Sequence, residues 1–226
     1  MTIFSLLTNK YTAIIVEPRK HAALSFVLEN FLKNLSDEWN IIIFHGNLNI
    51  EFINDIIEKN LYNYKNRISM ISLNKDNLTK DEYSKLLMNK YFYNFIPTQT
   101  FLIFQTDTII FEDNKELINI FLKYDYVGNG GLSLRKKSKM LEVIEKDADQ
   151  NNLSEDVYFS GTDKVELYKP SQEKSKLFSV EHMFSKITFG THQPWMIKYY
   201  HSEYYHEFYN LYPEIQKLED LQYIIN

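Results

Sequence analysis

The sequence contains no cysteine, which excludes disulfide bonds, zinc–thiolate sites and cysteine nucleophiles. Glycine and proline are also scarce, with 6 and 5 among 226 residues, so the places where they gather are informative. Gly128, Gly130 and Gly131 fall together, and Gly190 lies four residues before Pro194. Both groups are therefore candidate loops of a functional site.

Long apolar runs are absent as well. No segment approaches the roughly 20 apolar residues of a membrane-spanning helix, and residues 1–10 lack the basic start and apolar run of a signal peptide. Positive charge is not in excess, because the formal net charge is -5, and this argues against nucleic acid as the main partner. We therefore expect a soluble, cytoplasmic protein with no membrane span.

What is present suits one α/β domain over residues 1–226, because a chain of this length with 44% hydrophobic residues can bury one sizeable core. Apolar runs in the first half predict buried strands, and amphipathic patterns between them predict helices. The strands are expected at 12–16, 39–44, 68–73 and 100–104, and the helices at 22–35, 51–61 and 81–92. This alternation predicts right-handed βαβ units and a mainly parallel sheet.

The second half has a different pattern, with short apolar pieces that predict a mixed sheet. Strands are expected at 109–111, 126–128 and 132–134, helices at 117–123 and 137–146, and a loop at 146–154. Pro213 is well placed to start a final helix that ends near residue 225.

A polar group interrupts the apolar run of residues 101–111, Phe-Leu-Ile-Phe-Gln-Thr-Asp-Thr-Ile-Ile-Phe. A carboxylate at the carboxyl end of a central parallel strand faces the crevice where such sheets bind ligands, so Asp107 could hold a divalent cation against a diphosphate. The alternative is that Asp107 is a turn residue that caps the next element.

Three further stretches carry candidate site residues. Residues 127–135, Val-Gly-Asn-Gly-Gly-Leu-Ser-Leu-Arg, suit either a close approach of backbone to a ligand or a tight turn between strands. Ser154 suits a helix N-cap, with Glu155 and Asp156 in the first turn, which is ordinary capping or a catalytic carboxylate. His192, between Gly190 and Trp195, suits either a structural histidine or a Mn²⁺ ligand.

In this order the stretches resemble the GT-A glycosyltransferases, through Gln105-Thr106-Asp107, Asn129-Gly130-Gly131 with Arg135, Glu155-Asp156 and the loop 189–195. With the first strand and its loop, 13–19, they look like a compact, largely uncharacterised single-domain GT-A-like family of microbial and viral proteins. The resemblance implies an α/β, Rossmann-like fold with a mixed, mainly parallel central sheet flanked by helices. It also implies a nucleotide-binding half over about 11–110, an acceptor half over about 111–197 and an aromatic-rich helical tail over 198–226.

The resemblance further implies roles for individual residues. Asp107 and His192 would hold Mn²⁺ or Mg²⁺, although Gln105 stands where the family's Asp-x-Asp motif has its first acid. Asp156 would be the catalytic base, with Glu155 as its substitute. Contacts to the nucleotide-sugar donor would come from the following residues: Val16, Glu17, Arg19, Gln105, Thr106, Asn129, Gly130, Gly131 and Trp195.

The resulting hypothesis is a metal-dependent hexosyl- or N-acetylhexosaminyltransferase that uses a nucleoside-diphosphate sugar, with UDP preferred, and a glycan or protein acceptor. The first alternative is a non-catalytic nucleotide-sugar or glycan-binding protein with a degenerate metal motif, which Gln105 supports. A metal-dependent nucleotidyltransferase or sugar-nucleotide hydrolase ranks lower, because the glycine-rich phosphate loop is missing after the first strand. The tyrosines of 198–212 suit a helix packed on its own domain, a surface that stacks on acceptor sugars or a homodimer contact.

Overall fold

The computed structural model describes residues 9–147 and 153–224 and contains a central six-stranded sheet in the order β3-β2-β1-β4-β7-β6. Neighbouring strands among β1 to β4 run parallel, whereas β7 is antiparallel to both β4 and β6. The strands are β1 (Tyr11–Glu17), β2 (Trp39–His45), β3 (Ile68–Ser72), β4 (Thr100–Ile103), β6 (Tyr126–Asn129) and β7 (Leu132–Lys136). The predicted mixed, mainly parallel sheet is thus confirmed.

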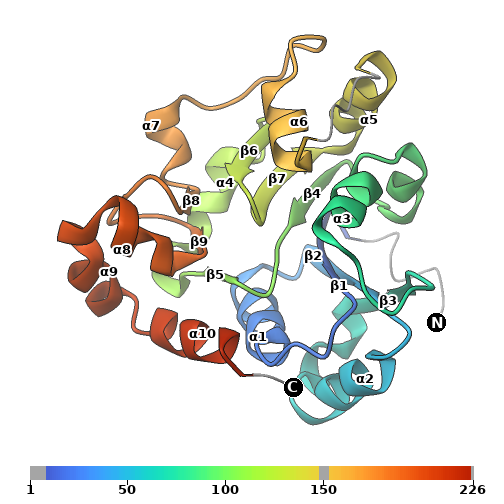
Figure 1. Cartoon of the computed structure of the whole chain (residues 1–226), viewed down its shortest axis with the longest axis horizontal. Helices are drawn as coiled ribbons and strands as arrows, with labels where there is room; N and C mark the ends of the chain where they lie inside the picture. Colours follow the sequence, from blue (N-terminus) through green and yellow to red (C-terminus); the bar gives the residue numbers. More distant parts are fainter. Residues whose placement is uncertain (1–8, 148–152, 225–226) are drawn as a thin grey trace.

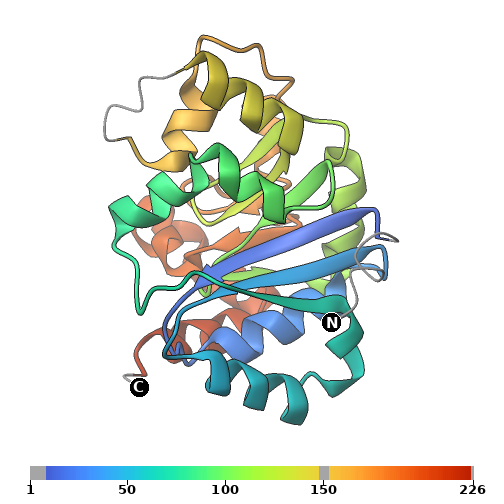
Figure 2. The same cartoon turned by 90° about the vertical axis from the view of Figure 1, so that its right-hand side faces the viewer.

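Both faces of this sheet are covered, which explains why its inner strands are almost continuously apolar. In β1, Ala13 and Ile15 belong to one buried cluster, and Ile14 and Val16 belong to a second cluster on the opposite face. Figure 2 shows helices on either side of the twisted strands. The helices are α1 (Leu24–Asn34) and α2 (Ile50–Lys59) on one face, and α3 (Lys80–Leu87), α5 (Lys137–Lys146) and α6 (Glu155–Gly161) on the other.

A second, three-stranded sheet follows the carboxyl end of β4. It has the order β5-β9-β8, so that β9 (Gly190–His192) lies between β5 (Thr108–Ile110) and β8 (Ser179–Val180). Strand β9 is antiparallel to β5 and parallel to β8. Because only residues 104–107 separate β4 from β5, the edge of the large sheet and the start of the small sheet meet at one place.

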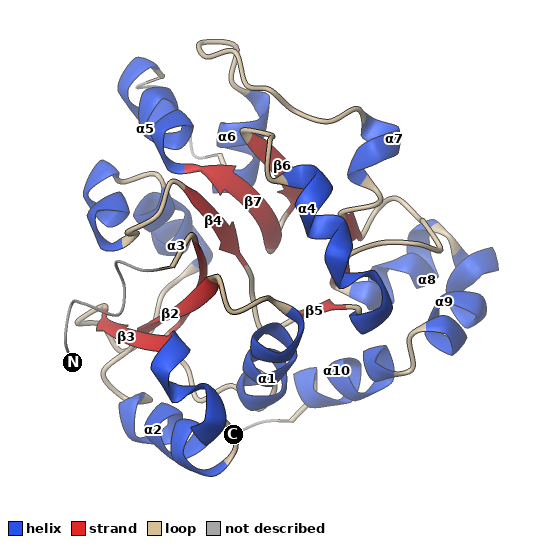
Figure 3. Cartoon of the chain, turned by 180° about the vertical axis from the view of Figure 1, so that it is seen from behind, coloured by secondary structure: helices blue, strands red, loops and turns tan. Residues whose placement is uncertain are grey.

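The C-terminal helices return to the N-terminal half. Figures 1 and 3 both show α10 (Glu214–Gln222) beside α1, far from it in the sequence. Phe111 stacks on Tyr212 with ring centroids 3.6 Å apart, which fastens this return to the core. The remaining helices are α4 (Ile118–Phe121), α7 (Gln172–Ser175), α8 (Ile197–Tyr200) and α9 (Tyr205–Leu211), with 3₁₀ helices Tyr62–Arg67, Lys90–Phe95, Glu112–Leu117, Pro194–Met196 and Ser202–Tyr204.

The predicted helices differ from the structure mainly at their ends. The helix expected at 81–92 ends at Leu87 and resumes as a 3₁₀ helix, because the Asn89 side chain accepts a hydrogen bond from the Tyr91 amide and so competes with continued α-helix. The helix expected at 117–123 is four residues long and follows a 3₁₀ turn. The tail at 198–212 is broken at His201, whose φ of -147° is not helical.

Two sequence-based expectations reach beyond the described residues, since residues 148–152 of the predicted loop and residue 225 at the end of the last helix fall there. Within the described residues, no helix combines the length and apolarity that crossing a membrane requires.

Candidate functional site

A cavity of about 710 Å³ lies at the carboxyl ends of β1 and β4, where the two sheets meet. This is the position at which open α/β sheets bind ligands. The sequence-predicted residues that line it are Val16, Glu17, Arg19, Gln105, Thr106, Asp107, Gly130, Gly131, Glu155, Asp156 and His192. Trp195 is partly buried outside the cavity lining, and the side chain of Asn129 lies outside what the structure describes.

Asp107 and His192 come together through the small sheet. The antiparallel register pairs Thr108 with His192, and the Gln193 amide donates a 3.0 Å hydrogen bond to the Asp107 carbonyl. As a result, Nε2 of His192 lies 3.3 Å from Oδ2 of Asp107. The Gln193 side chain also donates to Oδ2 at 3.0 Å, from a residue with the uncommon φ of 45°.

The protonation of this pair follows from burial and charge. Burial acts to raise the pKa of Asp107, but the imidazole of His192 and the amide of Gln193 outweigh it, so this pKa lies below its usual value. Burial acts to lower the pKa of His192, yet its interactions with Asp107 and Glu181 raise it to about 9. The local field therefore strongly favours a positive charge between the carboxylates.

The same atoms fit a divalent cation. Oδ1 of Asp107 and Nε2 of His192 are buried and make no hydrogen bond within the described residues. A carboxylate oxygen and an imidazole nitrogen are suitable ligands for Mn²⁺. Across residues 9–147 and 153–224 no group of three histidine or acidic side chains is arranged as a complete metal site, so water or a bound ligand would have to supply further ligands.

The glycine turn between β6 and β7 packs directly on the imidazole. A Cβ at Gly130 would lie 2.7 Å from Cε1 of His192, and a Cβ at Gly131 would lie 2.7 Å from Nε2 and 2.6 Å from Oε1 of Gln105. These distances are far shorter than van der Waals contact, so any larger residue would displace the ring. Glycine at these two positions therefore leaves room for the His192 ring, in addition to lining the cavity.

Adjacent carboxylates at the start of α6 have different surroundings. Glu155 is buried, and its Oε2 lies 2.6 Å from NH1 of Arg135, whose side chain is fully buried. Burial raises the pKa of Glu155, and the guanidinium of Arg135 opposes that shift. Asp156 is partly exposed to the cavity, and within the described residues no hydrogen bond or ion pair engages its carboxylate. Asp156 is therefore the carboxylate available to a ligand.

The expected capping role of Ser154 is only partly observed. Ser154 occupies the N-cap position of α6, but its side chain accepts no hydrogen bond from the helix. The first turn of α6 is instead held to β7 by the ion pair between Glu155 and Arg135. Arg135 is itself fixed within β7, because its Nε donates a hydrogen bond to the Ser133 hydroxyl at 2.9 Å. The Arg135 guanidinium lies 5.1 Å from the Tyr126 ring centroid as well.

The loop after β1 is held in one conformation. Arg19 donates to both carboxylate oxygens of Glu17, at 2.8 Å from Nε and 2.7 Å from NH2. The Asn49 side chain donates to the carbonyls of both residues, at 2.8 and 2.9 Å. Glu17 is buried, whereas the Arg19 side chain is 56% exposed, so Glu17 orients a guanidinium that faces the cavity.

Sequence reasoning missed several residues of the cavity wall. Glu181 follows β8 and is 6% exposed, with Oε2 3.3 Å from Nδ1 of His192. The Tyr83 hydroxyl, on α3, is buried without a hydrogen bond among the described residues. Gln222 donates to the Thr106 carbonyl at 2.9 Å from the last turn of α10. Tyr83 and Gln222 are single polar residues in ordinary helix patterns, and Glu181 is a single acid after a two-residue strand, so no sequence signal would have revealed them.

The cavity is rich in negative charge. Its lining includes five carboxylates, of which Glu17 and Glu155 are paired with arginines, and the lysine and arginine side chains among the lining residues are Arg19 and Lys80. A diphosphate entering this cavity therefore meets more negative than positive charge. A bound cation would offset this excess of negative charge.

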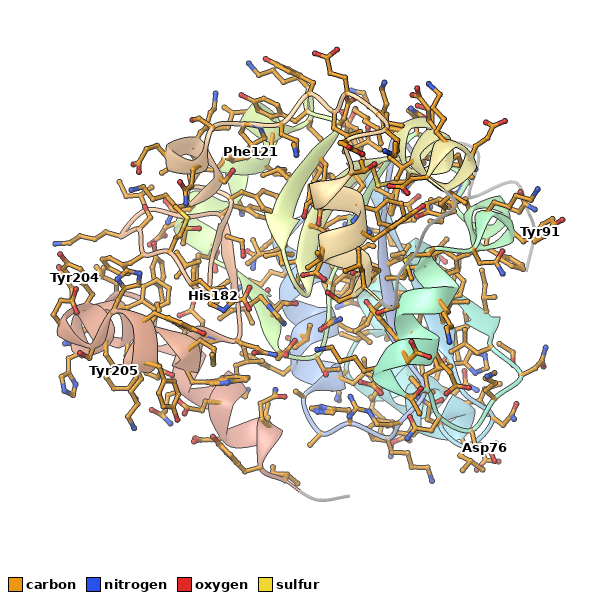
Figure 4. The ribbon with its side chains drawn as sticks, turned by 45° about the horizontal axis from the view of Figure 1, so that its top comes forward. Asp76, Tyr91, Phe121, His182, Tyr204 and Tyr205 are labelled. Atoms are coloured by element: carbon orange, nitrogen blue, oxygen red, sulfur yellow. The ribbon has the colours of Figure 1, made fainter. Side chains whose placement is uncertain are left out.

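The tyrosine-rich tail is not one continuous helix, and only part of it is exposed. Tyr212 is buried in the core and Tyr205 and Tyr209 pack against it, whereas Tyr199, Tyr200 and Tyr204 form an exposed surface. Phe184 stacks on Tyr204 with ring centroids 4.4 Å apart, and His182 meets Tyr200 at 4.6 Å. Tyr199 is 76% exposed. Figure 4 shows Tyr204 and Tyr205 on the C-terminal elements at one side of the molecule, with Tyr91 on the opposite side. Whether a glycan or a second copy covers this surface stays a prediction.

A known protein family matches more than half of the chain. Residues 67–129 and 127–194 match the family described as "Protein of unknown function (DUF5672)". The chain belongs to this family. The matched residues include Asp107, the glycine turn, the start of α6 and His192. No curated protein sequence matches the chain.

Solved structures identify the fold. The apo-form glycosyltransferase GlyE of Streptococcus pneumoniae TIGR4 is similar with a TM-score of 0.53 and 10% sequence identity, over 83% of this chain and 56% of that one. The mannosyltransferase PcManGT of Pyrobaculum calidifontis, in complex with GDP-Man and Mn²⁺, gives a TM-score of 0.44 and 7% identity over 58% and 45%. The chain spans about half the length of these glycosyltransferases. The likeness to GlyE shows that the fold is GT-A-like.

Proposed function

We propose that this protein is a metal-dependent glycosyltransferase that moves a hexosyl or N-acetylhexosaminyl group from a nucleoside-diphosphate sugar, with UDP as the expected base, to a glycan or protein hydroxyl. The observation that carries the proposal is the Asp107–His192 pair, joined at 3.3 Å in the cavity at the strand ends. The GT-A-like fold supports it. So does the excess of carboxylates, because a diphosphate donor needs a cation there.

In this proposal Asp107 and His192 hold Mn²⁺ or Mg²⁺. The bound ion would neutralise charge on the departing nucleoside diphosphate. Arg19, oriented by Glu17, contacts the nucleotide or its phosphates. The other donor contacts come from residues at the cavity wall: Val16, Gln105, Thr106, Gly130 and Gly131.

Asp156 acts as the general base in this proposal. It is the cavity carboxylate at the start of α6, and its neighbour Glu155 is engaged by Arg135. The Asp156 carboxylate accepts the proton of the acceptor hydroxyl as that oxygen attacks the anomeric carbon and the bond to the diphosphate breaks. A base of this kind suits inversion at the anomeric carbon.

A second candidate function is binding of a nucleotide sugar or glycan without turnover. Gln105 supports this alternative, because an uncharged side chain stands where the Asp-x-Asp motif of GT-A enzymes has its first acid. The Gln105 side chain lies against Gly131. Under this hypothesis the cation and donor bind, but no nucleoside diphosphate is released.

The test uses purified protein with Mn²⁺ and UDP-, GDP- and dTDP-sugars, recording thermal stabilisation and release of nucleoside diphosphate. Wild type should be stabilised by one donor only with Mn²⁺ and should release its diphosphate slowly. Asp107→Asn should lose both responses. Asp156→Asn should keep the stabilisation but release diphosphate about 100- to 10,000-fold more slowly, the usual contribution of a general base.

Asp163→Asn provides the matched control, because this carboxylate is 82% exposed and its ion pair, within the part of the chain that the structure describes, is with the neighbouring Lys164. It should behave as wild type. Stabilisation without any release of diphosphate would favour the binding protein. If none of the nucleotide sugars stabilises wild type, the proposal is wrong.

A further inference from the structure

Glu181 is a buried carboxylate with no role in the function proposed so far. It directly follows β8, and the parallel pairing of Val180 with Thr191 brings it beside His192. Its Oε2 lies 3.3 Å from Nδ1 of His192 and makes no hydrogen bond within the described residues. The three-stranded sheet thus carries His192 on its middle strand, with an acid from the segment on either side.

The imidazole cannot easily change its position between these acids. Cβ atoms at the glycine turn would lie 2.7 Å from Cε1 of His192 at Gly130 and 2.7 Å from Cδ2 at Gly131, so the turn packs along the ring. Nδ1 therefore faces Glu181, and Nε2 faces Asp107. In a ring that binds a metal only one nitrogen carries a proton, and packing alone does not decide which.

The two carboxylates differ in access. The Asp107 side chain is 16% exposed and that of Glu181 is 8% exposed, so the cavity reaches Asp107 more readily. A cation entering from the cavity reaches Asp107 before Glu181, and Nε2 of His192 lies beside Asp107. A histidine that ligates a metal through one nitrogen commonly donates its other N–H to a carboxylate, and this fixes the tautomer.

We infer that Glu181 is a positioning residue that accepts a hydrogen bond from Nδ1–H of His192 and thereby presents the Nε2 lone pair, with Asp107, to a divalent cation. This inference rests on the proposed function. Without a metal, a proton on Nε2 faces Asp107 at 3.3 Å; with the Nδ1–H donated to Glu181, a divalent cation can replace the Nε2 proton and bind both Nε2 and Asp107.

The test measures affinity for Mn²⁺ alone by calorimetry, in wild type and in Glu181→Gln, Glu181→Ala, Asp107→Ala and Glu173→Gln. Glu181→Ala should weaken Mn²⁺ binding by about 10- to 100-fold, the usual cost of losing such a partner. Glu181→Gln should lose less, because its amide oxygen still accepts from Nδ1–H. Asp107→Ala should lose most. Glu173→Gln should have no effect, because Glu173 is exposed and is not among the residues that line the cavity.

A second readout follows the tautomer itself. In protein saturated with the diamagnetic Mg²⁺, long-range ¹H–¹⁵N spectra of His192 should show the proton on Nδ1 in wild type and in Glu181→Gln. In Glu181→Ala the Nδ1 proton should lose its acceptor, so its signal should broaden through exchange with water. Melting temperatures without metal identify any variant that fails to fold, and Glu181→Gln then carries the test, with a Mn²⁺ affinity below that of wild type and above that of Asp107→Ala.

The possible failures are distinct. Wild-type affinity in both Glu181 variants overturns the inference and leaves the proposed function standing. Equal losses in Glu181→Gln and Glu181→Ala overturn it too, because the carboxylate would then act through its charge. A larger loss in Glu181→Ala than in Asp107→Ala reverses the two roles and also overturns it. If wild type itself binds no Mn²⁺, the metal site of the proposed function fails first.

Discussion

Glu155 and Asp156 show that neighbouring residues of one type can have different roles. Successive side chains on a helix point about 100° apart, so two adjacent acids cannot share one environment. Glu155 points to the buried Arg135, and removing either partner of such a pair typically costs about 3–5 kcal/mol. Asp156 points to the cavity. The pair therefore fixes the helix that aims Asp156.

Glu82 makes a pH-dependent contribution to the stability of α3, a helix that lines part of the cavity. Glu82 does not line the cavity but caps the N-terminus of α3. Its carboxylate accepts a hydrogen bond from the Thr79 amide at 2.9 Å and forms an ion pair with Lys75 at 2.5 Å. The Lys75 ammonium, followed by Thr79, lowers the pKa of Glu82 to about 2. Because the pKa of Glu82 in the folded state lies below its ordinary value of 4.5, ionised Glu82 stabilises the folded protein fully above pH 4.5. This stabilisation is lost as the pH falls towards 2.

We therefore expect Glu82→Gln to be less stable than wild type at neutral pH, and this difference to shrink as the pH falls from 4.5 to about 2. Glutamine keeps the capping-box geometry, so the comparison isolates the charge. Urea unfolding at a series of pH values measures it. Lys75→Met should reduce the same pH-dependent difference, and a constant gap between wild type and Glu82→Gln would contradict the assignment.

The candidate residues that line the cavity were predictable where they lie in short motifs, and those that tertiary structure adds were not. Asp107 was predictable because it interrupts a buried run at a strand end, and His192 because scarce glycine and proline surround it. Glu181 follows a two-residue strand whose pairing depends on β9, and no local pattern encodes that pairing. The packing of His192 on Gly130 was equally invisible, because glycine fits a turn, a ligand or a ring.

At the scale of elements, strands were easier to predict than helix ends. Strands β1 and β2 are buried on both faces, so their apolar runs mark them directly. The tail at 198–212 has tyrosines at many positions, so no apolar periodicity marks its helices. It is divided into α8, a 3₁₀ turn and α9, and residues from other segments, such as Phe184 on Tyr204, pack against it. Propensity alone could not determine those breaks.

The last helix, α10, lies beyond the residues matched by the family, yet it reaches the cavity. Gln222 donates to the Thr106 carbonyl next to Asp107, and the helix packs there through Ile215 and Leu218. Removing the hydrogen bond in Gln222→Ala should cost about 0.5–1.5 kcal/mol of unfolding free energy. It should also loosen residues 104–107 and reduce the thermal stabilisation by Mn²⁺ with UDP.

Gln216→Ala is the matched control for that experiment, because Gln216 lies on the same helix and, among the described residues, its side chain bonds to Asp220 at the surface. Stability should be followed by urea unfolding, and ligand response by the shift in melting temperature. A Gln222→Ala variant with the ligand response of Gln216→Ala would mean that α10 covers the cavity without influencing it.

At the scale of the whole molecule, the predicted nucleotide-binding and acceptor halves share one core. Phe31 of α1 stacks on Phe104 at 3.9 Å, and Phe111, just beyond β5, stacks on Tyr212 at 3.6 Å. These rings belong to one continuous buried cluster that joins the large sheet, the small sheet and the C-terminal helices. A core that crosses the predicted boundary near residue 110 favours cooperative unfolding.

The two tryptophans allow this cooperativity to be measured. Trp39 is buried in β2, whereas Trp195 lies in the 3₁₀ helix after His192, so Trp195→Phe leaves a probe of the first half and Trp39→Phe one of the second. Because both halves share the core, fluorescence and far-ultraviolet circular dichroism should give the same urea midpoint within each variant. Separate midpoints would show that the halves unfold independently, and then a ligand that bridges the cavity should bring them together.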